Sequence, residues 1–133
     1  MKYELTPDLQ TGNVLIDTEH RELLNAINKL MDACSKGQGK EEITKTLTFL
    51  NNYVVKHFSD EEKLQIQSKY PNYQPHKRFH ESYKAEMQAL AKELAADGYS
   101  IAFLGKLNQK IAVIINHIKQ EDKRLAAHIK ANK

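Results

Sequence analysis

The amino-acid sequence predicts an all-α protein, an antiparallel up-down-up-down four-helix bundle with an N-terminal arm. Apolar residues recur every three or four positions through most of the chain, which is the period of an amphipathic helix. Glycine and proline interrupt this pattern at only a few places, and no stretch alternates as a strand does. With 133 residues, of which 41% are hydrophobic, the chain is expected to form one domain over residues 1–133.

The first part of the chain predicts a polar arm and one helix. The arm is expected over residues 1–16 and the helix over about residues 18–36. Asp17 is a residue type that commonly caps a helix N-terminus, and Gly37 and Gly39 interrupt the apolar pattern at the other end. These residues therefore define the expected start and end of the first helix.

Proline and glycine delimit the next two helices. The second is expected over about residues 40–69 and ends before Pro71. Proline is tolerated in the first turn of a helix, so Pro75 is expected at the start of a third helix over about residues 75–97. Gly98 then ends the third helix, because glycine readily adopts the left-handed conformation of a helix C-terminus.

The last helix completes the predicted bundle. It is expected over about residues 100–130, with Ser100 as its N-cap. Short connections between the four helices favour antiparallel neighbours. In that arrangement the starts of the first and third helices lie at the same end of the bundle as the late parts of the second and fourth.

The composition argues against several classes of function. The net charge of +3 arises from 20 Lys and Arg residues spread among acidic residues, which indicates a solvated surface and no nucleic-acid partner. No apolar run approaches the ~20 residues that a membrane-spanning helix needs, and the N-terminal residues are too polar for a signal peptide. The single Cys34 cannot form an internal disulfide, so we expect a cytoplasmic protein. We also expect a monomer.

The second helix carries one carboxylate that is directed toward the core. At about 100° per residue, Glu61 falls in line with Ile43, at the centre of the apolar stripe, and His57 lies only about 40° away. The neighbouring Asp60 and Glu62 fall about 100° to either side, where a charge can reach water. Glu61 and His57 are therefore candidate functional residues.

Histidines interrupt two other stripes. His76 and His80 share the apolar face of Tyr83 on the third helix, and His20 shares the face of Leu24 on the first. A histidine pair at this spacing is weak evidence for a metal when it is taken alone. It gains weight only if the other helices bring further ligands to the same level.

The fourth helix leaves one assignment open. Asp122 lies on the stripe of Ile118 and Leu125, whereas His117 lies about 140° from Asp122 on an ideal helix. Glu121 would pair with His117 in regular α-helical geometry. A local π-bulge would instead bring His117 and Asp122 to the same side. The spacing alone does not choose between these two carboxylates.

The topology brings the inward-facing polar residues to one end of the bundle. Burying so many ionisable groups without a partner would be severely unfavourable, and a metal centre supplies that partner. The candidate ligands are His20, His57, Glu61, His76, His80, His117 and Asp122. Seven ligands are too many for one tetrahedral zinc, and imidazole and carboxylate donors without a thiolate favour a binuclear iron or manganese centre. Ferritin-like bundles differ because they repeat a Glu-x-x-His motif, which this chain lacks.

The order and spacing of these residues resemble the hemerythrin family over essentially the whole chain. The matching motifs are His20, His57-x-x-x-Glu61, His76-x-x-x-His80 and His117-x-x-x-x-Asp122, preceded by the segment TGNVLIDTEH that is typical of bacterial members. The resemblance implies two iron ions with an oxo or hydroxo bridge. By resemblance, His76, His80 and His117 would ligate one iron, His20 and His57 the other, and Glu61 and Asp122 would bridge them. Glu19 departs from the glutamine that is common at this position.

The same resemblance implies what the protein does. It predicts reversible dioxygen binding at an open iron position for oxygen storage, transport or delivery, without enzymatic turnover, and azide or other small anions as ligands of the oxidised form. An apolar pocket for dioxygen is expected from Leu23, Phe58, Val113, Ile114 and Ile118. The alternatives are a di-iron peroxide or nitric oxide reductase, and an oxygen or iron sensor that acts through a separate partner.

Overall fold

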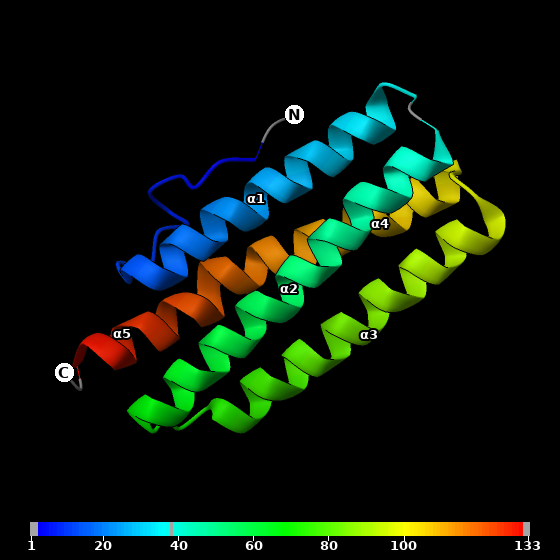
Figure 1. Cartoon of the computed structure of the whole chain (residues 1–133). Coiled ribbons are helices and arrows are strands. Elements are labelled where there is room, and N and C mark those ends of the chain that lie inside the picture. Colours follow the sequence, from blue (N-terminus) through cyan, green and yellow to red (C-terminus); the bar gives the residue numbers. More distant parts are fainter. Residues whose placement is uncertain (1–2, 38, 132–133) are drawn as a thin grey trace.

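The computed structural model describes residues 3–37 and 39–131, and all regular elements in these ranges are helical. Met1 and Lys2 of the expected arm, Gln38 of the expected break, and the last two residues of the expected domain lie outside the described residues. The elements are α1 (Val14–Ser35), α2 (Lys40–Ser68), α3 (Tyr73–Asp97), α4 (Ile101–His117), the π-helical η1 (Ile118–Asp122) and α5 (Lys123–Ala131). Because α4, η1 and α5 follow one another without a break, they form the fourth helix of the bundle (Figure 1).

The four long helices form the predicted antiparallel bundle. Helix α2 packs against α1, α3 and α5, and α3 packs against α4. Figure 1 shows the start of α1, the end of α2, the start of α3 and α5 at one end of the molecule. The arm lies along α1 (Figure 1), where the Asn28 side chain accepts from the backbone N–H of Tyr3 at 2.8 Å and donates to its carbonyl at 2.7 Å.

Helix α1 begins one turn earlier than predicted, so the assignment of Asp17 as its N-cap is wrong. Asn13 caps the helix, because its side-chain oxygen accepts from the backbone N–H of Ile16 at 3.0 Å. Asp17 lies in the first turn and accepts from the backbone N–H groups of Thr11 at 2.8 Å and Gly12 at 3.1 Å. Both side chains are acceptors for backbone donors, but Asp17 binds the arm and Asn13 binds the helix.

The other helix ends follow the predicted signals more closely. Helix α3 begins at Tyr73, so Pro75 lies in its first turn. Gly98 follows α3 with a φ of 77°, a value that glycine adopts without a steric cost. Ser100 caps α4, since its hydroxyl accepts from the backbone N–H of Phe103 at 3.0 Å. The sequence therefore predicted the end of α3 and the start of α4 correctly.

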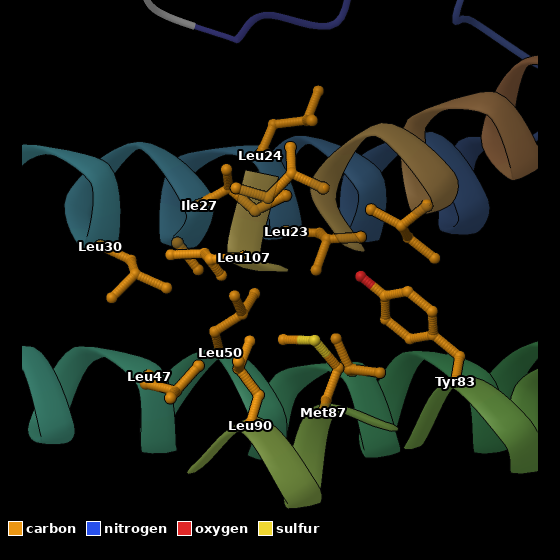
Figure 2. Close-up of a cluster of buried hydrophobic side chains, with 14 of the residues drawn as sticks. Leu23, Leu24, Ile27, Leu30, Leu47, Leu50, Tyr83, Met87, Leu90 and Leu107 are labelled. Carbon is orange, nitrogen blue, oxygen red and sulfur yellow. The ribbon is translucent and has the colours of Figure 1, made fainter. Parts of the chain in front are cut away.

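Apolar side chains fill the bundle on both sides of the polar level. The larger cluster contains layers from all four helices, and Figure 2 shows Leu23, Leu30, Leu50, Met87 and Leu107 facing one another within it. A smaller cluster lies toward the other end of the bundle and is formed by Ile16, Tyr70, Leu125 and Ala126. Along α1, His20 comes between Ile16 of the small cluster and Leu23 of the large one. The polar level is therefore enclosed by apolar packing above and below.

None of the helices in the described ranges combines the length and the hydropathy that crossing a membrane requires.

Candidate metal centre

The structure brings all seven predicted ligand residues to one buried level of the bundle. Helix α1 contributes one histidine, α2 a histidine and a glutamate, α3 two histidines, α4 one histidine, and η1 an aspartate. None of these residues is more than 5% exposed. They are His20, His57, Glu61, His76, His80, His117 and Asp122. Helices α2 and α3 each present their pair of polar side chains from successive turns, because residues four apart share a helix face.

Glu61 lies between two groups of histidines and directs one oxygen toward each. Its Oε2 is 3.4 Å from His57 Nε2 and 3.7 Å from His20 Nε2. Its Oε1 is 3.3 Å from His80 Nε2 and 3.5 Å from His76 Nε2. The two oxygens of one carboxylate therefore face different histidine pairs.

Asp122 divides its oxygens in the same way. Its Oδ2 is 2.9 Å from His20 Nε2. Its Oδ1 is 3.1 Å from His117 Nε2 and 3.2 Å from His76 Nε2. The centre thus has one half with His20 and His57 and another half with three histidines, and both carboxylates lie between the halves.

The π-helical segment η1 resolves the open assignment on the fourth helix. A π-helical turn holds more residues than an α-helical turn, so residues five apart come to lie on the same side. Asp122 is consequently buried and faces His117, and the sequence alternative, Glu121, points outward. The Glu121 side chain is 38% exposed and its carboxylate is 2.9 Å from the guanidinium of Arg124.

The electrostatics of the centre favour ionised carboxylates. Burial raises the pKa of Glu61, but the surrounding imidazoles of His57, His20 and His76 outweigh it and hold that pKa well below its usual range. Burial and the charge of Glu61 raise the pKa of Asp122, but the nearby imidazoles of His117, His20 and His76 outweigh both and hold that pKa well below its usual range. Burial lowers the pKa of His57, while Glu61 and Glu19 raise it to about 10. The two buried carboxylates therefore require positive charge beside them.

The donor atoms fit a pair of metal ions. Although the imidazole nitrogens and carboxylate oxygens lie close together, several of these inward-facing atoms have no hydrogen-bond partner with acceptable geometry among the described residues. They include the Nε2 atoms of His20, His57 and His80, both oxygens of Glu61, and Oδ1 of Asp122. Buried polar atoms of this kind are costly unless something binds them. The donors form two overlapping groups within which all ligand atoms lie within 4.8 Å of one another: Glu61, His76, His80 and His117; and His20, His57, Glu61 and Asp122.

Two further glutamates support ligand candidates from outside, and the sequence interpretation did not include them. Glu19 Oε1 lies 2.9 Å from His57 Nδ1, and Glu62 Oε2 lies 3.0 Å from His80 Nδ1. The helical wheel had directed Glu62 toward water, and its side chain retains 17% exposure. Glu19 is adjacent to His20 in the sequence and buried, but nothing in its helical position predicts a contact with His57 on α2.

Aromatic rings stack on two of the imidazoles. The ring of Phe58 lies on that of His80 with centroids 3.8 Å apart and an interplanar angle of 3°. Phe79 lies on His117 with centroids 4.0 Å apart and an angle of 7°. These contacts limit rotation of the two imidazoles. His128, the sixth histidine, lies away from the centre, with its Nε2 2.7 Å from the carbonyl oxygen of Ser68.

Four of the five residues predicted to line a dioxygen pocket are buried, and the fifth is not. Leu23, Phe58, Ile114 and Ile118 are at most 2% exposed and belong to the large apolar cluster. Val113 departs from the expectation, because its side chain is 43% exposed. It lines an open groove of about 390 Å³ on the outer side of α4 together with Phe79 and Asn116. Adjacent helical residues point about 100° apart, and on α4 this turns Val113 toward solvent while Ile114 faces the core.

The fold and the site together define a metal-binding four-helix bundle with a histidine-rich, carboxylate-poor donor set. A family model described as the hemerythrin HHE cation binding domain matches residues 11–129. This match covers most of the sequence, and the chain belongs to the hemerythrin family. The family consists of non-haem di-iron proteins that bind oxygen, and the donor groups described above are able to hold such ions.

Individual relatives agree with this assignment. The chain is 30% identical over 118 residues to a bacteriohemerythrin of Pseudomonas aeruginosa, covering 86% of this chain and 73% of the relative. It is 28% identical over 126 residues to a bacteriohemerythrin of Stenotrophomonas maltophilia, covering 94% of this chain and 80% of the relative. A crystal structure of a hemerythrin carrying a leucine-to-alanine substitution superimposes with a TM-score of 0.85 at 26% identity, covering 97% of this chain and 96% of that chain.

Proposed function

We propose that this protein binds dioxygen reversibly at two iron ions, as an oxygen store or carrier. The observation that supports this most strongly is the division of each buried carboxylate between two groups of histidines. One oxygen of Glu61 and one of Asp122 face the half with His20, while the other two oxygens face the half with His76. A pair of bridging carboxylates is the arrangement that two neighbouring cations require.

In this proposal the histidines divide unequally between the ions. His76, His80 and His117 would hold one iron, and His20 and His57 would hold the other. Glu61 and Asp122 would each offer one oxygen to either ion. When bound, the irons supply the electrons that reversible dioxygen binding uses. The half with His20 and His57 has one protein donor fewer, so dioxygen is expected there.

The surrounding side chains keep the site dry. Leu23, Phe58, Ile114 and Ile118 offer no hydrogen-bonding group, and each is almost fully buried. An apolar wall of this kind disfavours water and anions that compete for a metal position. Reversible binding, in contrast to irreversible oxidation, depends on this exclusion.

One chain supplies every donor that the proposal uses. The site therefore needs no second subunit, and we propose that the protein works as a monomer. A histidine-rich donor set is also less suited than the carboxylate-rich ferritin-like sites to oxidation chemistry, which supports carriage over catalysis.

Reversibility can be tested directly. The protein, loaded with two ferrous ions per chain and kept anaerobic, should develop a visible absorption band when air is admitted and lose it when the solution is purged with argon. The metal-free protein is the control. A band that never reverses, or sustained consumption of peroxide or nitric oxide, would replace carriage with one of the reductase functions.

A further inference from the structure

We propose that Glu19 and Glu62 are positioning residues of the metal centre, and that their negative charges lower the reduction potential of the bound metal pair. This inference rests on the proposed function for the identity of the metal. Both glutamates contact the Nδ1 atom of an imidazole, on the side of the ring that faces away from the candidate metal centre. Glu19 acts through His57 and Glu62 acts through His80, so each half of the centre has one histidine that is backed by a carboxylate.

Glu19 links His57 to the protein surface. It is only 4% exposed, and its two oxygens have different partners. Oε1 is 2.9 Å from His57 Nδ1, and Oε2 accepts from Lys56 Nζ at 2.8 Å. The Lys56 side chain is 59% exposed and also donates to Asp60 at 3.1 Å. The buried carboxylate of Glu19 is therefore ionised and partly neutralised by a cation that reaches solvent.

Glu62 takes the equivalent place on the other half. Its Oε2 is 3.0 Å from His80 Nδ1, and no hydrogen bond to a lysine or arginine accompanies it among the described residues. By contrast, Nδ1 of His20 and Nδ1 of His76 have no hydrogen-bond partner in the described part of the chain. The carboxylates are thus distributed one to each half instead of being gathered on one metal.

The direction of the effect follows from simple electrostatics. An imidazole whose Nδ1–H donates to a carboxylate presents the lone pair of Nε2 toward the centre and becomes a stronger electron donor. A stronger donor and a nearby negative charge both stabilise the more highly charged, oxidised metal. Burial strengthens the effect because the surrounding dielectric is low. Lys56 should oppose it on the Glu19 side.

Charge and geometry can be separated by conservative substitutions. Glu19→Gln and Glu62→Gln keep an oxygen that can accept from Nδ1–H but remove the charge. Each iron-loaded variant is titrated with dithionite, which supplies the two electrons that take the ferric pair to the ferrous pair. We expect both substitutions to raise the midpoint potential and Lys56→Gln to lower it, at unchanged iron content.

A matched control removes a glutamate charge elsewhere. Glu86 is 50% exposed and is paired with Lys110 on the surface, so Glu86→Gln should leave the midpoint potential at its wild-type value. The proposal would be overturned if both Glu19→Gln and Glu62→Gln had the wild-type midpoint potential. It would also be overturned if Lys56→Gln and Glu19→Gln shifted the midpoint potential in the same direction. These results are distinct from a failure of oxygen carriage, which the wild-type protein alone would reveal.

Positioning has a second readout that does not depend on iron chemistry. Glu19→Leu removes the acceptor as well as the charge, and supports of this kind typically contribute 10–100-fold to metal affinity. We expect roughly that loss when the metal-free protein competes with a chelator for Zn²⁺, and a much smaller loss for Glu19→Gln. Equal affinities for wild type and Glu19→Leu would show that Glu19 does not position His57.

Discussion

His117 and Asp122 lie five residues apart in the sequence, yet His117 Nε2 is 3.1 Å from Asp122 Oδ1. A regular α-helix would place these side chains about 140° apart. The π-helical segment Ile118–Asp122 removes this separation and turns Glu121 outward. Which carboxylate of the fourth helix faces the candidate metal centre therefore depends on one irregular turn.

This geometry predicts opposite results for two neighbouring substitutions. Asp122→Ala should abolish the paired metal centre, because it removes an oxygen from each half. Glu121→Ala should leave two irons per chain, since the Glu121 carboxylate points outward and pairs with the exposed Arg124. Iron analysis of both purified variants, with circular dichroism to verify folding, makes the comparison. Iron loss in Glu121→Ala with retention in Asp122→Ala would refute the arrangement.

Truncating Ile114 should open the apolar wall. Ile114 is 2% exposed in the large cluster, and Ile114→Ala should cost about 2–5 kcal/mol of unfolding free energy. We expect iron content to persist while azide enters faster and the oxygenated form decays sooner. Val113→Ala is the matched control, because Val113 is 43% exposed and should affect neither rate. Stopped-flow rates equal to wild type in Ile114→Ala would show that Ile114 does not guard the site.

Removing the metal should destabilise the bundle. The buried carboxylates of Glu61 and Asp122 would lose their cations, while the folded state would lose the free energy of ligand binding. At a free metal concentration 100 times the dissociation constant, that contribution is about 2.7 kcal/mol. Thermal unfolding before and after treatment with a chelator measures it. The purified protein should hold two irons per chain. An unchanged thermal unfolding temperature after full iron removal would contradict the expected stabilisation.

The hydrogen bond of Tyr83 should contribute to the free energy of unfolding, and this contribution should depend on pH. Its side chain is 3% exposed, and its hydroxyl donates to the carbonyl of Lys110 at 2.8 Å. Tyr83→Phe should therefore lower the free energy of unfolding by about 0.5–1.5 kcal/mol at pH 8, with iron content unchanged.

The pH dependence has a definite sign. Burial, together with the charge of Glu86, raises the pKa of Tyr83 in the folded protein above its ordinary value. Above about pH 10 the unfolded chain releases the Tyr83 proton while the folded chain retains it, so wild type loses stability that Tyr83→Phe cannot lose. Urea unfolding at pH 8 and pH 10.5 should show the difference between the two proteins narrowing. A constant or widening difference would contradict the assignment.

Much of the fold and of the candidate site followed from the sequence because helical periodicity is local information. The position of Glu61 in line with Ile43 identified an inward-facing carboxylate before any tertiary contact was known, and the structure buries Glu61 at 1% exposure. Gly98 and Ser100 marked helix ends through their own backbone and side-chain chemistry. The antiparallel order of four helices then sufficed to bring distant histidines to one level.

Tertiary structure decided the features for which two local solutions compete. Asn13 and Asp17 can each accept backbone hydrogen bonds, and the fold of the arm onto α1 determined which one caps the helix. The contact of Glu19 with His57 joins two helices, so no single-helix pattern contains it.

The irregular turn at η1 is the clearest such case. A π-helical turn is intrinsically less favourable than an α-helical one, and nothing within the segment Ile118–Asp122 requires it. Its cost is offset only when Asp122 reaches histidines of α1, α3 and α4. Helical periodicity specified which residues face the core of an ideal helix. Packing of that helix against the others decided where it departs from α-helical geometry, because the π-helical turn brings the buried carboxylate of Asp122 to histidines of α1 and α3.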